Sequence, residues 1–208
     1  GKSQTGLVSV SAVADYEKDI IKKHELTRPE KEQDRISHMS ITGAQTGNVF
    51  LAYKTNKNLS KLISDWKKSN PPVYDFIAED EIGHVIWRVD APETIQTITG
   101  IFKNEIPFTY IADGHHRAAS AAKVKHALGD KASAAAEYFL TTLFPADELR
   151  ILDYNRVVKD LNGLTSTGFL EKLKKDFRVE KSDAAFSPEY LHQFGMYLDD
   201  QWYRLEAK

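Results

Sequence analysis

Cysteine is absent from this 208-residue sequence, and its absence excludes several kinds of chemistry. Without a thiol the chain forms no disulfide, performs no cysteine-based catalysis and holds no cysteine-ligated zinc. The sequence also has no apolar run that approaches the roughly 20 residues needed to span a bilayer, so we expect no membrane partner. No signal peptide is recognisable, and we therefore expect a cytoplasmic protein.

An excess of charge of one sign is also missing. The chain has 28 lysines and arginines against 30 aspartates and glutamates, which gives a net charge of -2 at pH 7. Such a balance does not indicate a polyanion-binding surface, and we expect no DNA partner. A hydrophobic content of 41% allows one substantial core, or a core with a small appendage. The sequence begins with Gly1 rather than Met, and we expect it to be part of a longer protein.

Chemistry-bearing side chains are concentrated between residues 107 and 122, in the segment PFTYIADGHHRAASAA. Residues 108–112 form a short apolar run typical of a buried strand, which Asp113 and Gly114 end. An alanine-rich segment follows immediately and stops at Gly129. The pattern therefore predicts a strand, a tight turn and a helix.

The predicted helix begins with three basic side chains, His115, His116 and Arg117. Cations are unfavourable at a helix N-terminus, because the macrodipole is positive there, unless an anion binds nearby. Backbone N–H groups, close approach at Gly114 and a bidentate arginine are the components of a phosphate site. Asp113, at the strand end, is placed to hold a Mg²⁺ shared with those phosphates. The plainer alternative is that Asp113 is only a helix cap.

A second polar cluster, HELTRPEKEQDR, lies at residues 24–35. Thr27 and Glu30 fit the capping box that opens a helix, and Pro29 suits an early helical position. The pattern predicts a helix over residues 28–38.

Glu25 lies in the loop before this helix, and we interpret it as a general base. A carboxylate surrounded by basic side chains, Arg28 among them, keeps its charge and suits proton acceptance or metal binding better than acid catalysis. The alternative is a solvated run of charges. The polar face of the predicted helix would carry Arg28, Glu32 and Arg35.

The rest of the chain alternates strand and helix patterns. Strands are predicted at residues 5–13, 49–53, 136–144 and 149–152, and a hairpin is predicted from residues 73–78 and 84–89. Helices are predicted at residues 59–68, 91–102 and 165–176. Further strands are predicted at residues 177–179 and 195–205, the second of them broken near Asp199 and Asp200. We divide the chain into a domain of residues 1–162 and a small C-terminal α+β extension of residues 163–208, with the alternative that the extension is part of the same domain. Arg156, among apolar neighbours, could complete a phosphate or carboxylate site, or form only a salt bridge.

Taken together, the two polar clusters resemble the ParB/sulfiredoxin-like superfamily. Free L-serine kinases of that superfamily carry the same DGHHR string at a strand–helix junction, with a His-Glu pair upstream. The blocks KHELTRPEKEQDR, VFLAY, ADGHHR and RVV also resemble the domain-of-unknown-function family 1015 over most of the chain. The resemblance implies an α+β fold with a ParB-like mixed sheet and flanking helices. Sulfiredoxin chemistry is excluded because its cysteine is missing, and no helix-turn-helix is recognisable.

The resemblance also implies roles for individual residues. In that superfamily the Gly-His-His-Arg turn cradles nucleotide phosphates, a role carried here by Gly114, His115, His116 and Arg117. The proposed catalytic base of the serine kinases corresponds to Glu25, and the motif aspartate, acting at the metal or the substrate hydroxyl, corresponds to Asp113. Further candidates for substrate or phosphate contacts are His24, Thr27, Arg28 and Arg156.

Two functions from different classes follow. One is a kinase that uses Mg²⁺ and ATP or ADP to phosphorylate a small hydroxyl-bearing substrate, with free serine as the candidate. The other is a regulatory module that binds the nucleotide without catalysis or hydrolyses it slowly. A metal-dependent hydrolase that uses His115 and His116 is a weaker third option, because adjacent helical residues point about 100° apart. A long insert separates Glu25 from Asp113, and the kinase hypothesis requires that both line one cleft.

Overall fold

The structure is a computed structural model that describes residues 3–208. It contains two compact units, one extending to Arg150 and the other running from Ile151 to Lys208. The sequence-based boundary at residues 162/163 therefore lies later than the observed one. Residues 149–165 contain no helix or strand, so the sequence has no periodic pattern that would mark the border between the units. The strand predicted at residues 149–152 is wrong for the same reason. Within the second unit, Ser187 Oγ donates to Asp153 Oδ1 at 2.9 Å.

The first unit is built on a mixed five-stranded sheet with the strand order β1-β7-β3-β6-β2. Its strands are β1 (Leu7–Ala12), β2 (Ile21–Lys22), β3 (Val49–Tyr53), β6 (Thr109–Asp113) and β7 (Tyr138–Pro145). Strands β1 and β7 pair antiparallel, as do β3 and β6, whereas β3–β7 and β2–β6 are parallel. The mixed sheet expected from the sequence is confirmed, with β3 at its centre.

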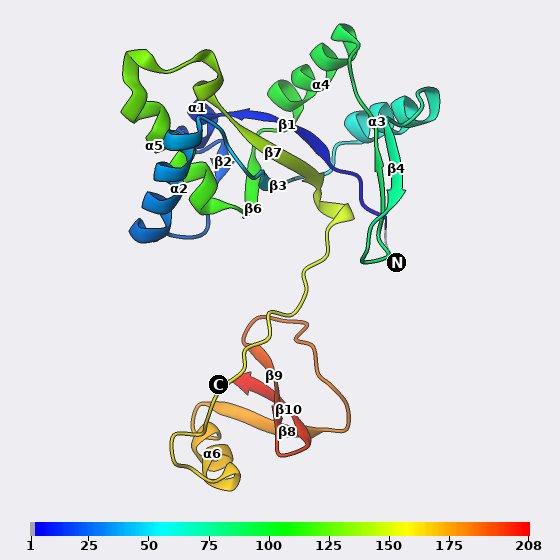
Figure 1. Cartoon of the computed structure of the whole chain (residues 1–208). Helices are drawn as coiled ribbons and strands as arrows, with labels where there is room; N and C mark the ends of the chain where they lie inside the picture. The colour runs from blue at the N-terminus through cyan, green and yellow to red at the C-terminus, as the bar shows by residue number, and fades with distance from the viewer. Residues whose placement is uncertain (1–2) are drawn as a thin grey trace. The chain divides into compact units, whose positions relative to one another are not determined.

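Helices cover both faces of this sheet. They are α1 (Val13–Glu17), α2 (Pro29–Thr42), α3 (Lys57–Ser69), α4 (Pro92–Glu105) and α5 (His115–Leu128), with short 3-10 turns η1 (Gly129–Lys131), η2 (Ala134–Glu137) and η3 (Ala146–Glu148). In Figure 1, α1, α2 and α5 lie on one side of the sheet, and α3 and α4 lie on the other. The predicted hairpin is confirmed as β4 (Tyr74–Ile77) and β5 (Gly83–Ile86). Each helix within residues 3–208 is too short or too polar to cross a membrane.

The core of the first unit lies between the sheet and its helices. Along β3 the side chains of Val49, Leu51 and Tyr53 are buried, and the residues between them are only partly buried. This alternation follows from the two-residue period of a strand. Helix α5 contributes small buried residues, Ala118 and Ala121 among them, which let its backbone approach the sheet closely. Close packing of α5 fixes the position of its first turn.

The second unit is a small α+β structure, as predicted. It contains α6 (Ser166–Leu173), β8 (Phe177–Ser182), β9 (Gln193–Leu198) and β10 (Gln201–Ala207). The three strands form an antiparallel sheet in the order β8-β10-β9. Asp199 and Asp200 connect β9 to β10 with φ angles of 49° and 56°, which is the geometry of a tight hairpin turn. The predicted break in the strand pattern at these two aspartates is confirmed.

We expect Leu51→Ala to lower the free energy of unfolding by about 2–5 kcal/mol, because the side chain is fully buried and its truncation leaves a cavity in the central strand. Urea denaturation measures the change. Leu26→Ala is the control, since its side chain is 98% exposed and its truncation should change stability by less than about 0.5 kcal/mol. Equal losses in the two variants would contradict the assignment of the core.

Candidate functional site

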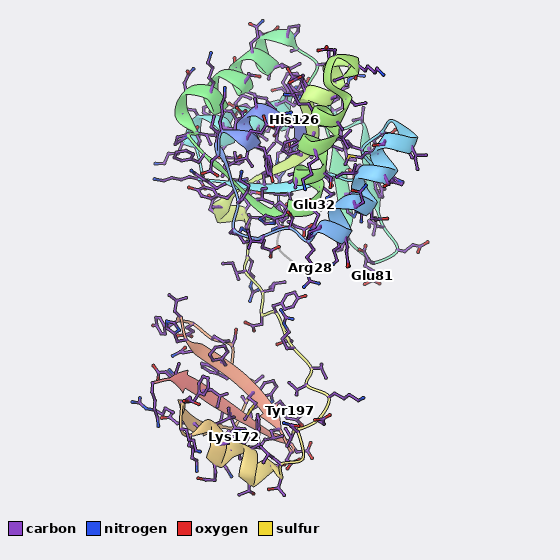
Figure 2. The ribbon with its side chains drawn as sticks, turned by 90° about the vertical axis from the view of Figure 1, so that its left-hand side faces the viewer. Arg28, Glu32, Glu81, His126, Lys172 and Tyr197 are labelled. Carbon is purple, nitrogen blue, oxygen red and sulfur yellow. The ribbon has the colours of Figure 1, made fainter. Side chains whose placement is uncertain are left out.

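A cleft of about 480 Å³ lies where the first turn of α5 faces the start of α2 and the loop that precedes it. Its lining residues are Glu25, Glu30, Lys31, Asp34, Arg35, Asp113, Gly114, His115, His116 and Arg117. Figure 2 shows Arg28 and Glu32 at the beginning of α2 on this side of the first unit. The two polar clusters of the sequence therefore meet, and Glu25 and Asp113 line the same cleft despite the long insert between them.

The junction between β6 and α5 forms one wall of the cleft. Gly114 is the N-cap of α5 and has a φ of 98°, a left-handed conformation that favours glycine. No side chain among residues 3–208 caps this helix, so the N–H groups of its first turn lack the usual side-chain acceptor. The alternative that Asp113 is only the helix cap is wrong, because Asp113 is the last residue of β6.

Arg117 is held at the cleft by a carboxylate, and two glycines leave room for its side chain. Its Nη2 donates to Asp113 Oδ2 at 2.6 Å. A Cβ atom on Gly114 would lie 3.0 Å from the guanidinium, and one on Gly47 would lie 3.3 Å from Arg117 Cδ, so both glycines leave room for this side chain. Arg117 Nε is buried and has no hydrogen-bond partner among the described residues. Arg117 therefore keeps a donor available, and Asp113 offsets its charge at the positive end of α5.

His115 contacts both residues of the His-Glu pair. Its ring is 4% exposed, and its Nε2 accepts the backbone N–H of His24 at 3.4 Å. That bond assigns the ring proton to Nδ1, which lies 3.7 Å from Glu25 Oε2. Burial, followed by the nearby His24, lowers the pKa of His115 below its usual value. The imidazole is therefore neutral at pH 7 and adds no charge to the N-terminus of the helix.

His116 holds the other end of the same loop. Its Nε2 accepts the backbone N–H of Arg28 at 3.0 Å. The two adjacent imidazoles thus anchor residues 24–28, a segment that has no helix or strand of its own. The sequence analysis missed this anchoring role, since neither the spacing nor the residue type shows which backbone group an imidazole will contact.

A buried carboxylate joins α2 to α5. Glu32 is 4% exposed and forms an ion pair with Lys123, while Ser120 Oγ donates to the Glu32 carbonyl oxygen at 3.3 Å. Hydrogen bonds from Lys123 and then from Thr27 lower the pKa of Glu32. The prediction that Glu32 lies on the polar face of its helix is therefore wrong. The predicted capping box is wrong too, because α2 has Arg28 as its N-cap and no side-chain cap.

The remaining candidates fall into two groups. Thr27 and Arg28 belong to the anchored loop, where Thr27 bonds Glu32 and the Arg28 backbone bonds His116. Arg156 belongs to the second unit and stacks on the Tyr154 ring at 4.7 Å, so its role in phosphate binding stays a prediction. The sequence analysis missed the cleft-lining side chains of α2, namely Glu30, Lys31 and Asp34. The available signal was helical spacing, because Glu30 and Asp34, and likewise Lys31 and Arg35, lie four residues apart and so share a side of the helix.

Arg35 and Arg117 also line a second hollow of about 270 Å³ next to the cleft. Apolar side chains of Met39, Val49 and Phe139 form part of its wall. The two arginines thus line both hollows.

The family of the chain is established by comparison with known proteins. Residues 1–208 match the family described as "Protein of unknown function (DUF1015)", and the chain belongs to this family. No curated protein and no solved structure matches the chain. Membership of family 1015, expected from the sequence blocks, is confirmed; the likeness to the ParB/sulfiredoxin-like superfamily and to serine kinases stays a prediction.

The ion pair between Glu32 and Lys123 predicts a pH-dependent contribution to stability. Because the folded state lowers the pKa of Glu32 from its ordinary 4.5, the carboxylate stabilises the fold at pH values above 4.5, and this contribution is lost as the pH falls through the lowered pKa. We expect Glu32→Gln to lower the free energy of unfolding at pH 7 by about 1–3 kcal/mol. The difference from the wild type should shrink as the pH is lowered below 4.5.

Urea denaturation over a series of pH values measures this difference. Glu79→Gln, at an exposed position between the strands of the hairpin, is the control and should have little effect at any pH. A loss in Glu32→Gln that is the same at acidic and neutral pH would contradict the electrostatic account.

Proposed function

We propose that the cleft binds a nucleotide by its phosphates and that the protein is a nucleotide-dependent kinase of small molecules. The observation that carries the proposal is that Glu25 and Asp113 line one cleft with the uncapped start of α5. Phosphoryl transfer needs mainly positioning and charge neutralisation, and these groups supply both. We include in the proposal a ParB/sulfiredoxin-like fold, with which the mixed sheet and its flanking helices are compatible. A cytoplasmic location is also part of the proposal.

The phosphates of ATP or ADP would lie against Gly114 and the N–H groups of His115, His116 and Arg117. Helix N-termini bind phosphate because their N–H groups point outward and the macrodipole is positive there. Arg117 Nε, buried and without a partner among the described residues, supports a role for this side chain in holding an oxyanion.

Asp113 would hold Mg²⁺ beside the phosphates. Its side chain is exposed, and Oδ2 is the oxygen that bonds Arg117, which leaves Oδ1 as a potential ligand. Mg²⁺, when bound, neutralises negative charge on the nucleotide. Without such a cation, the Asp113 carboxylate would repel a phosphate at this position.

Glu25 would accept the proton of the substrate hydroxyl. Its carboxylate is exposed at the cleft, and the Nδ1 proton of His115 lies on the side that faces it. A neutral imidazole can orient the carboxylate without neutralising it. Free serine is the hydroxyl compound that the resemblance suggests, and it is the first acceptor to test.

Loss of the Arg117 guanidinium should weaken nucleotide binding about tenfold or more, because a charge-assisted hydrogen bond contributes about 1.5–3 kcal/mol. Calorimetric titration of Arg117→Ala with ATP and ADP in the presence of Mg²⁺ tests this. Arg88→Ala is a matched control, since Arg88 also pairs with an aspartate, Asp90, but on an exposed surface. Unchanged affinity in Arg117→Ala would rule out phosphate binding at this turn.

Replacing the proposed base should abolish turnover but leave nucleotide binding intact. We expect Glu25→Gln to slow phosphorylation by roughly 10²- to 10⁴-fold, the usual contribution of a general base, and to change nucleotide affinity by less than about threefold. Phosphorus NMR with ATP or ADP and a panel of small hydroxyl compounds, serine first, measures the product. Glu79→Gln is the control and should match the wild type. Full activity in Glu25→Gln would exclude Glu25 as the base.

A second candidate is a regulatory module that binds nucleotide and does not phosphorylate a small molecule, or hydrolyses the nucleotide slowly. The 3.7 Å approach of Glu25 Oε2 to His115 Nδ1 is compatible with this function as well, because the carboxylate can hold the imidazole instead of accepting a proton. Nucleotide binding without product from any acceptor, together with equal hydrolysis by wild type and Glu25→Gln, would identify this function.

A further inference from the structure

We propose that His24, Glu25 and His115 form a binding site for a transition-metal dication, with Zn²⁺ as its probe. Each residue offers one ligand atom, and these atoms all lie within 4.8 Å of one another. The site is separate from the proposed Mg²⁺ site, which uses Asp113. The proposal does not depend on nucleotide binding or on kinase activity.

The donor set determines the kind of metal. Two imidazoles and one carboxylate suit Zn²⁺ and neighbouring first-row ions, whereas Mg²⁺ prefers oxygen ligands only. Three protein ligands leave at least one coordination position for water or for an oxygen of a bound compound. His116 is not part of the set, since its Nε2 accepts the Arg28 N–H.

The ligand atoms, all within 4.8 Å of one another, need to move only a little to reach the separations of a zinc site. With Zn–N and Zn–O bonds of roughly 2.0–2.1 Å, adjacent ligand atoms of a tetrahedral site lie about 3.4 Å apart. Glu25 Oε2 and His115 Nδ1 are 3.7 Å apart. His24 and Glu25 are exposed and can rotate to close the remaining gaps, while the buried His115 provides a fixed point. The rings of His24 and His115 already lie edge to face, with centroids 4.4 Å apart.

Metal binding requires a change of tautomer at His115. In the arrangement described above, Nε2 accepts the His24 N–H and Nδ1 carries the proton. Coordination through Nδ1 uses its lone pair for the bond to the metal, and the proton moves through solvent to Nε2. The His24 N–H then faces a second donor and must turn away from the ring, and the contact that is lost is 3.4 Å long and therefore weak. No electron is transferred, and the net proton count of the ring does not change.

The second half of the loop that carries two of the ligands is held independently of them. The 3.0 Å bond from the Arg28 N–H to His116 Nε2 and the contact of Thr27 with Glu32 fix its second half. The site is thus partly pre-organised, so less ordering of the chain opposes metal binding. A bound metal would also engage the Glu25 carboxylate and so withdraw it from proton acceptance.

Calorimetric titration with Zn²⁺ in the absence of nucleotide, and metal analysis after dialysis, test the proposal. We expect one Zn²⁺ per chain with a Kd on the order of 1 μM or below. Mg²⁺ should not bind comparably. His24→Ala and Glu25→Gln should each weaken binding about tenfold or more, since even outer-shell substitutions cost 10- to 100-fold. Both residues are exposed, so these variants should fold even if a His115 variant does not.

His84→Ala is the matched control, because His84 lies on the hairpin and stacks on Phe76, and this variant should bind Zn²⁺ like the wild type. Absorption of a Co²⁺-substituted sample gives a second readout, in which intense visible bands indicate a tetrahedral site. Failure to bind one Zn²⁺, or unchanged affinity in the His24→Ala/Glu25→Gln double variant, would overturn the proposal. Because nucleotide is absent, neither result bears on the kinase proposal.

Discussion

Two imidazole nitrogens that accept backbone N–H groups hold the cleft together. His115 and His116, at the start of α5, bond the amides of His24 and Arg28. The segment between those amides has no secondary structure, so its own backbone does not hold it in place. The position of residues 24–28, and with it that of Glu25, depends chiefly on the 3.0 Å bond from Arg28 to His116, which the weaker His24 contact and the Thr27–Glu32 contact supplement. The ion pair between the buried Glu32 and the exposed Lys123 supports them by joining α2 to α5.

The charges at the start of α5 are compatible with either an empty or an occupied cleft. Burial keeps His115 neutral, and Asp113 offsets the charge of Arg117, so the positive end of the helix dipole meets little net charge. A phosphate would add negative charge where uncapped N–H groups are available. The same phosphate would compete with Asp113 for Arg117, which is why the proposed function includes a divalent cation at this carboxylate.

Local signals in the sequence were sufficient to predict the strand–turn–helix at β6 and α5. An apolar run, the Asp-Gly pair, the alanines and Gly129 all act within a few residues of each other, and the observed boundaries follow them. The same holds for β3, whose alternating burial needs only a two-residue period. Membership of family 1015 was also predictable, because the sequence blocks that identify it are continuous.

Features that depend on distant residues could not be predicted in this way. Glu32 has the charge of a surface residue on a polar helix face, yet its partner Lys123 lies 91 positions away, and only the packing of α2 on α5 brings them together. Thr27 fits a capping box, but its hydroxyl bonds Glu32 instead. The roles of the two histidines as anchors likewise became visible only when the loop and α5 were seen together.

The central claim is that the cleft at the start of α5 binds phosphate groups. An NMR titration of the ¹⁵N-labelled chain with ADP and Mg²⁺ tests it most directly. The account predicts that the largest saturable shifts fall on the amides of residues 114–117, with smaller ones in the anchored loop at residues 24–28. Saturable shifts centred elsewhere in the chain, or no shifts at all, would contradict it.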